Sequence, residues 1–205
     1  LLGTALVDMY AKCGEMGKAS QVFDELLVQD AISWNALISG YTQQGQGEDA
    51  LTSFERMESN GVSPNVITFT CILKACGSIG AINKGKQIHN EILSRSLLEK
   101  DIMLGTGLID MYAKCGALGK VHKLFQMLPV RNTVSWNTLI TGYVEHGENR
   151  EALKCFDEMK EERSYPDHIT FVYSLKACGG TRLLGKGRQT HSDVERLGLL
   201  HKDLS

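Results

Sequence analysis

Apolar residues recur along the chain with the spacing of helices that bury one side. Within residues 31–65 they form two runs of helical period, separated by a glycine-containing turn. No run of alternating β-branched residues predicts a strand, and the chain has only three prolines. The pattern therefore predicts an all-α protein. The apolar positions of the two runs are Leu37, Ile38 and Tyr41, then Ala50, Leu51, Phe54 and Met57.

The chain also repeats itself. A shift of 102 residues aligns its two halves without a gap, and the strings SWN, ITF and LKACG occur in both. Such self-similarity at a fixed period indicates two copies of one long unit. The matched pairs include Trp34 with Trp136, Pro64 with Pro166, His89 with His191 and Asp101 with Asp203.

Each long unit divides into three pieces, and each piece predicts a helix, a short turn and a second helix. Glycines lie where the two helices must reverse, at Gly14, Gly45, Gly116 and Gly147. A single hairpin cannot bury its apolar stripe, so we predict that the hairpins stack into a solenoid. The predicted pieces are 1–30, 31–65 and 66–101, then 102–132, 133–167 and 168–203, and residues 204–205 would open another.

Composition and charge narrow the function without identifying it. Hydrophobic residues make up 42% and charged residues 22% of the chain, a normal globular balance. No stretch approaches the roughly 20 apolar residues that span a bilayer, and the first residues carry no visible targeting peptide. The net charge of −2 gives no overall basic field, so any nucleic-acid affinity must come from local geometry and a few positioned cations.

The residues that usually carry catalysis or bind metals are not arranged for either. The six cysteines form no C-x-x-C pair. Two H-x-E triplets occur, at 89–91 and 146–148, but the P-C-x-x-C that completes a zinc deaminase is missing. A P-loop and a nucleophile elbow are missing as well. We therefore predict no catalytic residue, no metal, no cofactor and no small-molecule substrate in these residues.

The pieces resemble tandem pentatricopeptide repeats of plant organelles, in the class that alternates short, standard-length and long motifs. The strings DMYAKCG, SWNALISGY and ITFTCILKACG carry this resemblance over essentially the whole chain. It implies a right-handed α-solenoid superhelix of helix-turn-helix repeats. The short motifs would be 1–30 and 102–132, the standard motifs 31–65 and 133–167, and the long motifs 66–101 and 168–203.

The resemblance also implies a function and partners. It implies sequence-specific binding of single-stranded RNA in mitochondria or chloroplasts, with recognition of C-to-U editing sites as the leading role. Deamination would need a deaminase domain outside these residues or in a partner, and organellar editing-factor proteins would dock on the long motifs. The alternatives are a non-catalytic role in RNA stabilisation or translation, a component of a ribonucleoprotein, and a protein-binding scaffold, which the mild acidity suits.

In each predicted first helix a polar row follows i, i+4, i+8, which also fits an ordinary solvated face. In the family that the chain resembles, the fifth and last residues of a motif together select one base. Thr with Asp implies G, Thr with Asn A, Asn with Asp U, and Asn with Asn a pyrimidine, often C. Because long motifs read poorly, the implied order from 5′ to 3′ is G, pyrimidine, unspecified, A, U, unspecified. The pairs are Thr4 with Asp30, Asn35 with Asn65, Thr70 with Asp101, Thr106 with Asn132, Asn137 with Asp167, and Val172 with Asp203.

Two further sets of residues would contact RNA. The second residue of every piece is apolar, and in the family such residues sandwich the base; packing at the helix entry is the alternative. Lysines at the end of four polar rows could pair with phosphates, or could serve only solubility. The second residues are Leu1, Ile32, Ile67, Met103, Val134 and Ile169, and the lysines are Lys12, Lys74, Lys114 and Lys176.

Overall fold

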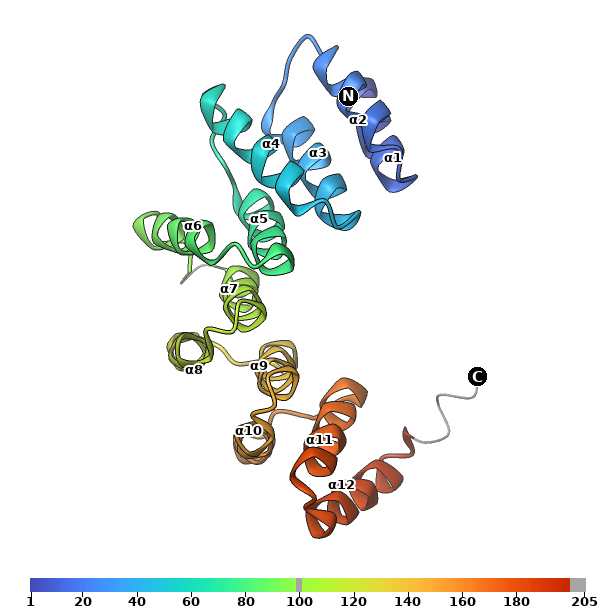
Figure 1. The fold of residues 1–205 in the computed structure, drawn as a ribbon, viewed down its shortest axis with the longest axis vertical. Coiled ribbons are helices and arrows are strands. Elements are labelled where there is room, and N and C mark those ends of the chain that lie inside the picture. The colour runs from blue at the N-terminus through green and yellow to red at the C-terminus, as the bar shows by residue number, and fades with distance from the viewer. Residues whose placement is uncertain (99–100, 200–205) are drawn as a thin grey trace. The chain divides into compact units, whose positions relative to one another are not determined.

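The structure is a computed structural model that describes residues 1–98 and 101–199. Every regular element in these ranges is an α-helix, and there are twelve of them (Figure 1), which confirms the predicted all-α class. Each of these helices is too short or too polar to cross a lipid bilayer. The chain forms two compact units, Leu1–Cys115 and Gly116–Ser205.

The first unit holds seven helices in its described residues and the second holds five. The helices of the first unit are α1 (Leu2–Lys12), α2 (Met16–Asp24), α3 (Ala31–Gln43), α4 (Gly47–Ser59), α5 (Val66–Ile79), α6 (Ile82–Ser94) and α7 (Ile102–Lys114). Those of the second are α8 (Leu118–Met127), α9 (Thr133–Glu145), α10 (Asn149–Glu161), α11 (His168–Thr181) and α12 (Leu184–Arg196).

Local sequence explains where these helices begin and reverse. Five odd-numbered helices start after an Asp or Asn whose side-chain oxygen accepts hydrogen bonds from the first free backbone N–H groups, the usual role of these residues at a helix N-terminus. Most reversals fall on glycines with positive φ, as at Gly45 (73°) and Gly147 (77°), a conformation that glycine adopts without steric cost; between α11 and α12 the left-handed residue is Arg182 instead. The five capping residues are Asp30, Asn65, Asp101, Asn132 and Asp167.

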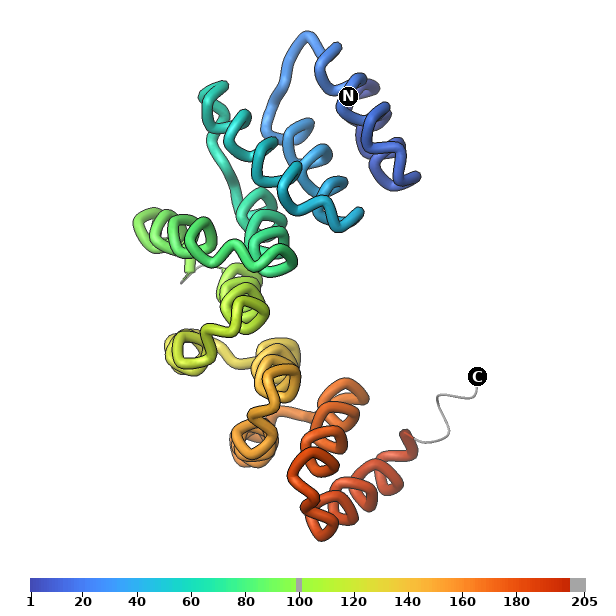
Figure 2. The backbone as a smooth tube through the Cα atoms, viewed as in Figure 1, coloured from blue at the N-terminus to red at the C-terminus, as the bar shows by residue number. Residues whose placement is uncertain are grey.

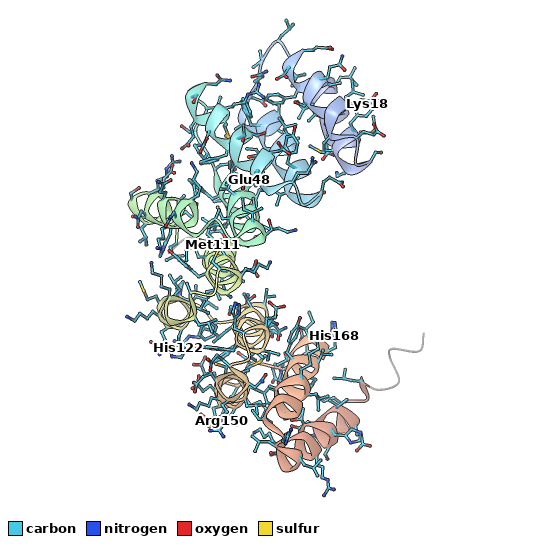
Figure 3. All side chains as sticks on the ribbon, viewed as in Figure 1. Lys18, Glu48, Met111, His122, Arg150 and His168 are labelled. Carbon is cyan, nitrogen blue, oxygen red and sulfur yellow. The ribbon has the colours of Figure 1, made fainter. Side chains whose placement is uncertain are left out.

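In the first unit the hairpins stack along the chain, as the tube in Figure 2 shows. Each odd-numbered helix contacts the next odd-numbered helix, and each even-numbered helix packs against the first helix of the following hairpin. The rings of Phe23 and Trp34 meet edge to face at 4.4 Å between centroids. Helices α6 and α7 approach closely at Gly85. A Cβ on Gly85 would lie 2.5 Å from the Sδ atom of Met111, which Figure 3 labels on α7.

The second unit uses the same packing, 102 residues later. Phe125 and Trp136 meet edge to face at 4.4 Å between ring centroids, as Phe23 and Trp34 do in the first unit. Helices α9, α10 and α11 contact one another, and α12 packs on α11. Both tryptophans are almost fully buried, so the α3–α4 and α9–α10 hairpins are each anchored to the preceding helix by a large aromatic side chain.

Candidate nucleic-acid interface

The predicted reading residues at the last position of a piece lie where one hairpin ends and the next first helix begins, whereas those at the fifth position lie within the first helix. The last residue of a predicted piece is the N-cap of the following helix, so its side-chain oxygen is already used by backbone N–H groups. Asn65, for example, accepts from the backbone nitrogens of Ile67 and Thr68 at 3.0 and 3.2 Å. The cap therefore fixes which atoms of the last residue remain for a ligand.

Asn35 and Asn65 are brought together across a hairpin boundary. The Asn35 Nδ2 atom donates to Asn65 Oδ1 at 3.2 Å, and the Thr68 hydroxyl donates to Asn35 Oδ1 at 2.6 Å. Asn35 is 8% exposed, so these bonds satisfy an amide that would otherwise be costly to bury. One N–H of Asn35 and the amide nitrogen of Asn65 remain available as donors.

Asn137 and Asp167 form the matching arrangement in the second unit, at the start of α11, next to His168, which Figure 3 labels. Asn137 Nδ2 lies 2.9 Å from Asp167 Oδ1 and 3.0 Å from Oδ2, and the Thr170 hydroxyl lies 2.5 Å from Asn137 Oδ1. The backbone N–H of Thr170 also donates to Asp167 Oδ1, at 3.0 Å. The pair therefore leaves one amide N–H and, because Oδ2 already accepts from Asn137, the remaining lone pair of Oδ2 for a ligand.

Desolvation by partial burial raises the pKa of Asp167, but the hydrogen bonds it accepts outweigh this effect. The backbone of Thr170 and the side chains of Asn137 and Thr170 all stabilise the charged form, so the pKa lies below its ordinary value. The pKa of Asp30 is lowered as well, first of all by the backbone N–H of Ser33. Both caps therefore carry a negative charge near neutral pH.

The threonines at the fifth positions are held differently. The hydroxyls of Thr70 and Thr106 donate to the backbone oxygens of Val66 and Ile102, at 2.8 and 3.0 Å. Their lone pairs remain for a ligand. No direct hydrogen bond links Thr4 to Asp30, or Thr70 to Asp101, in the part of the chain that the structure describes.

The fourth and sixth predicted pairs are not described as pairs by the structure. Thr106 belongs to the first unit and Asn132 to the second, so each is described only within its own unit. Val172 is an exposed apolar residue on α11, and Asp203 lies outside the described residues.

The six apolar second residues are all exposed. Leu1 at the chain end is fully exposed, and the other five have 41–67% of their surface accessible. These side chains therefore leave much of their surface open to a ligand. The five are Ile32, Ile67, Met103, Val134 and Ile169.

The lysines of the polar rows differ in how much of their charge is free. Lys12 pairs with Asp8 at 2.7 Å, and Lys114 pairs with Asp110 at 2.8 Å. Lys176 lies over the ring of Tyr173, 4.6 Å from its centroid. Lys74 forms no ion pair within residues 1–98 and 101–199. Two of the four cations are thus partly compensated by a carboxylate one turn away, a pairing that the i, i+4 spacing of the sequence predicts.

Groups suited to catalysis are not assembled in the described residues. No cluster of three His, Cys, Asp or Glu side chains there could hold a metal ion. The cysteines are free thiols, and burial raises the pKa of Cys155 to about 12 and that of Cys76 to about 11, so both remain protonated. His89, from the first H-x-E triplet, lies 3.0 Å from the Tyr112 hydroxyl between two packed helices.

Thr68 and Thr170 were not singled out by sequence reasoning. Each is fully buried, and each donates to the fifth-position Asn of the preceding hairpin. Both threonines lie in the string ITF, at 67–69 and 169–171, so their recurrence is visible in the sequence. The string does not reveal their contact with an asparagine, because that contact joins residues 33 positions apart.

Family models and curated relatives that match this chain are of the pentatricopeptide repeat type. A PPR repeat family model matches residues 29–78 and 131–180, and a PPR repeat model matches 4–29 and 106–132. A pentatricopeptide repeat-containing protein of Arabidopsis thaliana is 41% identical over 198 residues, 96% of this chain and 25% of that protein. Another from the same plant, named as chloroplastic, is 38% identical over 95% of this chain and 31% of its own length. A third, named as mitochondrial, is 40% identical over 91% and 30%.

Solved structures agree on the fold. The crystal structure of the pentatricopeptide repeat protein PPR10 from maize superposes with a TM-score of 0.75 at 18% identity, over 95% of this chain and 29% of that one. The same maize protein in complex with an 18-nt psaJ RNA element gives a TM-score of 0.76, over 92% and 29%. This likeness shows a solenoid of helical hairpins. The chain spans about a quarter to a third of the length of these relatives.

Proposed function

The chain belongs to the pentatricopeptide repeat family, and from this premise we propose that its repeats bind single-stranded RNA, one base to each repeat. The observation that carries the proposal is the pair of hydrogen-bonded couples, Asn35 with Asn65 and Asn137 with Asp167. In each couple the cap and the neighbouring Thr use some hydrogen-bonding groups and leave others for a ligand. Those remaining atoms form a donor and acceptor pattern that a base edge can match.

Asn137 and Asp167 fit uracil. Their free groups are an amide N–H and the carboxylate oxygen Oδ2, one donor and one acceptor. The Watson–Crick edge of uracil offers a carbonyl acceptor beside the N3–H donor, which complements this pattern. Cytosine has an unprotonated N3 at the same place, so its lone pair would face the Asp167 carboxylate. The fifth repeat is therefore proposed to select U over C.

Asn35 and Asn65 fit cytosine instead. Because the Oδ1 atom of Asn65 caps α5, its amide nitrogen is the group left for RNA. Two N–H donors then face the base, and cytosine offers two acceptors, N3 and O2. The N3–H of uracil would face a second donor and bind less well. The pyrimidine implied for the second repeat is thus narrowed to C.

The threonine repeats follow from the same reasoning. The lone pairs of a Thr4 hydroxyl and the carboxylate of Asp30 are acceptors that suit the N1–H and N2–H groups of guanine. Thr106 and Asn132 lie in different units, so A at the fourth base is proposed from the family resemblance alone. The proposed order, from 5′ to 3′, is G, C, unspecified, A, U, unspecified.

The exposed second residues support stacking. Apolar side chains such as Ile32 and Ile67 can hold a base between consecutive repeats, and one stacked base contributes about 1–3 kcal/mol when aromatic side chains do this. Bulk charge contributes little, because the net charge is −2 and Lys12 and Lys114 are paired with carboxylates. We therefore expect a shallow dependence of affinity on salt.

Within the cell we propose that these repeats mark an organellar transcript for C-to-U editing. The support is the alternation of short, standard and long pieces, together with relatives whose names place them in chloroplasts or mitochondria. Deamination would be carried out by a domain outside these residues or by a partner protein. Editing-factor proteins would dock on the long motifs, residues 66–101 and 168–203.

Fluorescence anisotropy tests RNA binding directly. The probe is a labelled single-stranded RNA carrying the proposed order, compared with the same RNA in which A and G are exchanged, at two salt concentrations. We expect tighter binding to the proposed order. Absence of binding to either RNA at low salt, by protein that circular dichroism shows to be helical, would reject RNA recognition and favour a protein-binding scaffold.

A further inference from the structure

Thr68 and Thr170 occupy the third position of α5 and α11. Each contacts the fifth-position asparagine of the preceding repeat, Asn35 or Asn137. These two asparagines are called the asparagine readers. We propose that these threonines are positioning residues that set base specificity by fixing the orientation of the Asn35 and Asn137 amides. This inference rests on the proposed function. Neither threonine faces the ligand side, since both are fully buried.

The positions of the protons define this role. The Thr170 hydroxyl oxygen lies 2.5 Å from Asn137 Oδ1, and the Thr68 hydroxyl oxygen lies 2.6 Å from Asn35 Oδ1. Two oxygens at this distance need a proton between them, and an amide oxygen has none. The threonine hydroxyl is therefore the donor, and the Oδ1 atom of each reader must face it.

The second anchor of each reader excludes the flipped amide. In the second unit the Asp167 carboxylate accepts from Asn137 Nδ2, so a flipped amide would place oxygen against oxygen. In the first unit Asn65 Oδ1 is already fixed by the N-terminus of α5 and accepts from Asn35 Nδ2. With Thr on one side and the cap on the other, only one amide orientation satisfies both, and it presents N–H to the base.

The corresponding serines show that capping alone does not require this contact. Ser33 and Ser135 also occupy the third position of a first helix, but their hydroxyls donate to the backbone oxygens of Asp30 and Asn132, both at 2.9 Å. Each of those helices follows a repeat whose fifth residue is Thr rather than Asn. In the described residues, the third-position side chain is thus a threonine that donates to an asparagine reader where the fifth residue of the preceding repeat is Asn.

The test uses Thr170→Val, which keeps the shape of the side chain and removes its hydroxyl. We expect the preference for U over C at the fifth base to fall by about tenfold, the scale of one bidentate base contact. The preference for C over U at the second base stays unchanged. Thr68→Val should show the reverse, and Thr170→Ser should restore the wild-type preference, because serine keeps the donor.

Ser135→Ala is the matched control for the loss of a cap. Like Thr170→Val it removes a hydroxyl that accepts from an N-cap backbone N–H, but that hydroxyl bonds the backbone of the cap and contacts no fifth-position asparagine. Thermal unfolding should show comparable destabilisation in both variants, whereas only Thr170→Val changes the preference at the fifth base. An unchanged preference in Thr170→Val, or an equal loss of affinity for all RNAs, would overturn the positioning role.

A measurement without RNA separates this inference from the proposed function. In NMR spectra of the free protein, the two side-chain amide protons of Asn137 should differ in chemical shift and exchange rate, because one of them bonds Asp167. Thr170→Val should reduce that difference as the amide reorients. An unchanged amide signal overturns the positioning, whereas failure of the wild type to bind any RNA overturns the proposed function.

Discussion

The side-chain amide of Asn137 donates to the carboxylate of Asp167 across a hairpin boundary, with Nδ2 2.9 Å from Oδ1. Asp167 is also the N-cap of α11, so one carboxylate both starts a helix and holds the preceding reader. Asn65 does the same for Asn35 in the first unit. The proposed function therefore assigns helix capping and the presentation of groups to a base to the same side chain.

Removing the Asn137 amide should change the titration of Asp167. This amide stabilises the charged carboxylate, so we expect Asn137→Ala to raise the pKa of Asp167 toward its ordinary value near 3.9. NMR titration of the Asp167 carboxyl in both proteins measures the change. Asn35→Ala is the control, because Asn35 contacts no part of Asp167, and an identical pKa in wild type and Asn137→Ala would contradict the account.

Acid should weaken the helix N-termini that Asp30 and Asp167 cap. Both carboxyls have a lowered pKa in the folded chain. Their contribution to stability is therefore present above the unfolded pKa, near 3.9, and is lost as pH falls through the lower folded value. Thermal unfolding followed by circular dichroism should show that Asp167→Asn reduces the acid sensitivity. Equal loss of stability on acidification in wild type and variant would refute this role for Asp167.

Ile32 and Trp34 are two residues apart on α3 and should have opposite effects. Trp34 is fully buried against Phe23, so Trp34→Ala should cost about 3–5 kcal/mol of unfolding free energy. Ile32 is 67% exposed, so Ile32→Ala should change stability by less than about 0.5 kcal/mol and weaken RNA binding. Denaturant titration and anisotropy measure the two effects. A large stability loss for Ile32→Ala would show that Ile32 is a core residue.

The thiols should differ sharply in reactivity. Cys13 is exposed, whereas burial raises the pKa of Cys155 to about 12. We expect a thiol-specific reagent at pH 8 to modify Cys13 in the folded protein and to reach Cys155 only after unfolding, because the thiolate is the reacting form. Mass spectrometry of digested, partly labelled protein identifies the sites. Early labelling of Cys155 would contradict the packing of α10.

Much of the fold could be predicted from the sequence because its signals are local. The 3.6-residue spacing in α3 and α4, and glycines such as Gly45 at the reversals, depend on neighbours a few residues apart. The assignment of Asn35 with Asn65 as one pair came from family resemblance, since their contact spans 30 residues and depends on how hairpins stack. The position of the Thr68 hydroxyl could not be predicted for the same reason.

The ion pair of Lys12 was not predicted, although the sequence contains the information for it. Lys12 and Asp8 are four residues apart on one helix, so their ion pair could have been predicted from spacing alone. The exposure of Ile32 and its equivalents could not, because an apolar residue near a helix start can pack inward or face solvent. Whether such a residue is buried or exposed depends on how the neighbouring hairpins pack.

The central claim, that capping and reading share one side chain, is tested most directly by exchanging the cap. Asp167→Asn keeps an Oδ1 atom for the α11 N-terminus and replaces Oδ2 with an amide nitrogen. Anisotropy titrations with RNAs that differ only at the fifth base should show a preference for U in the wild type and for C in the variant. Asn65→Asp is the control and should change the second base from C to U. An unchanged preference for U in Asp167→Asn, with the protein folded, would contradict the account.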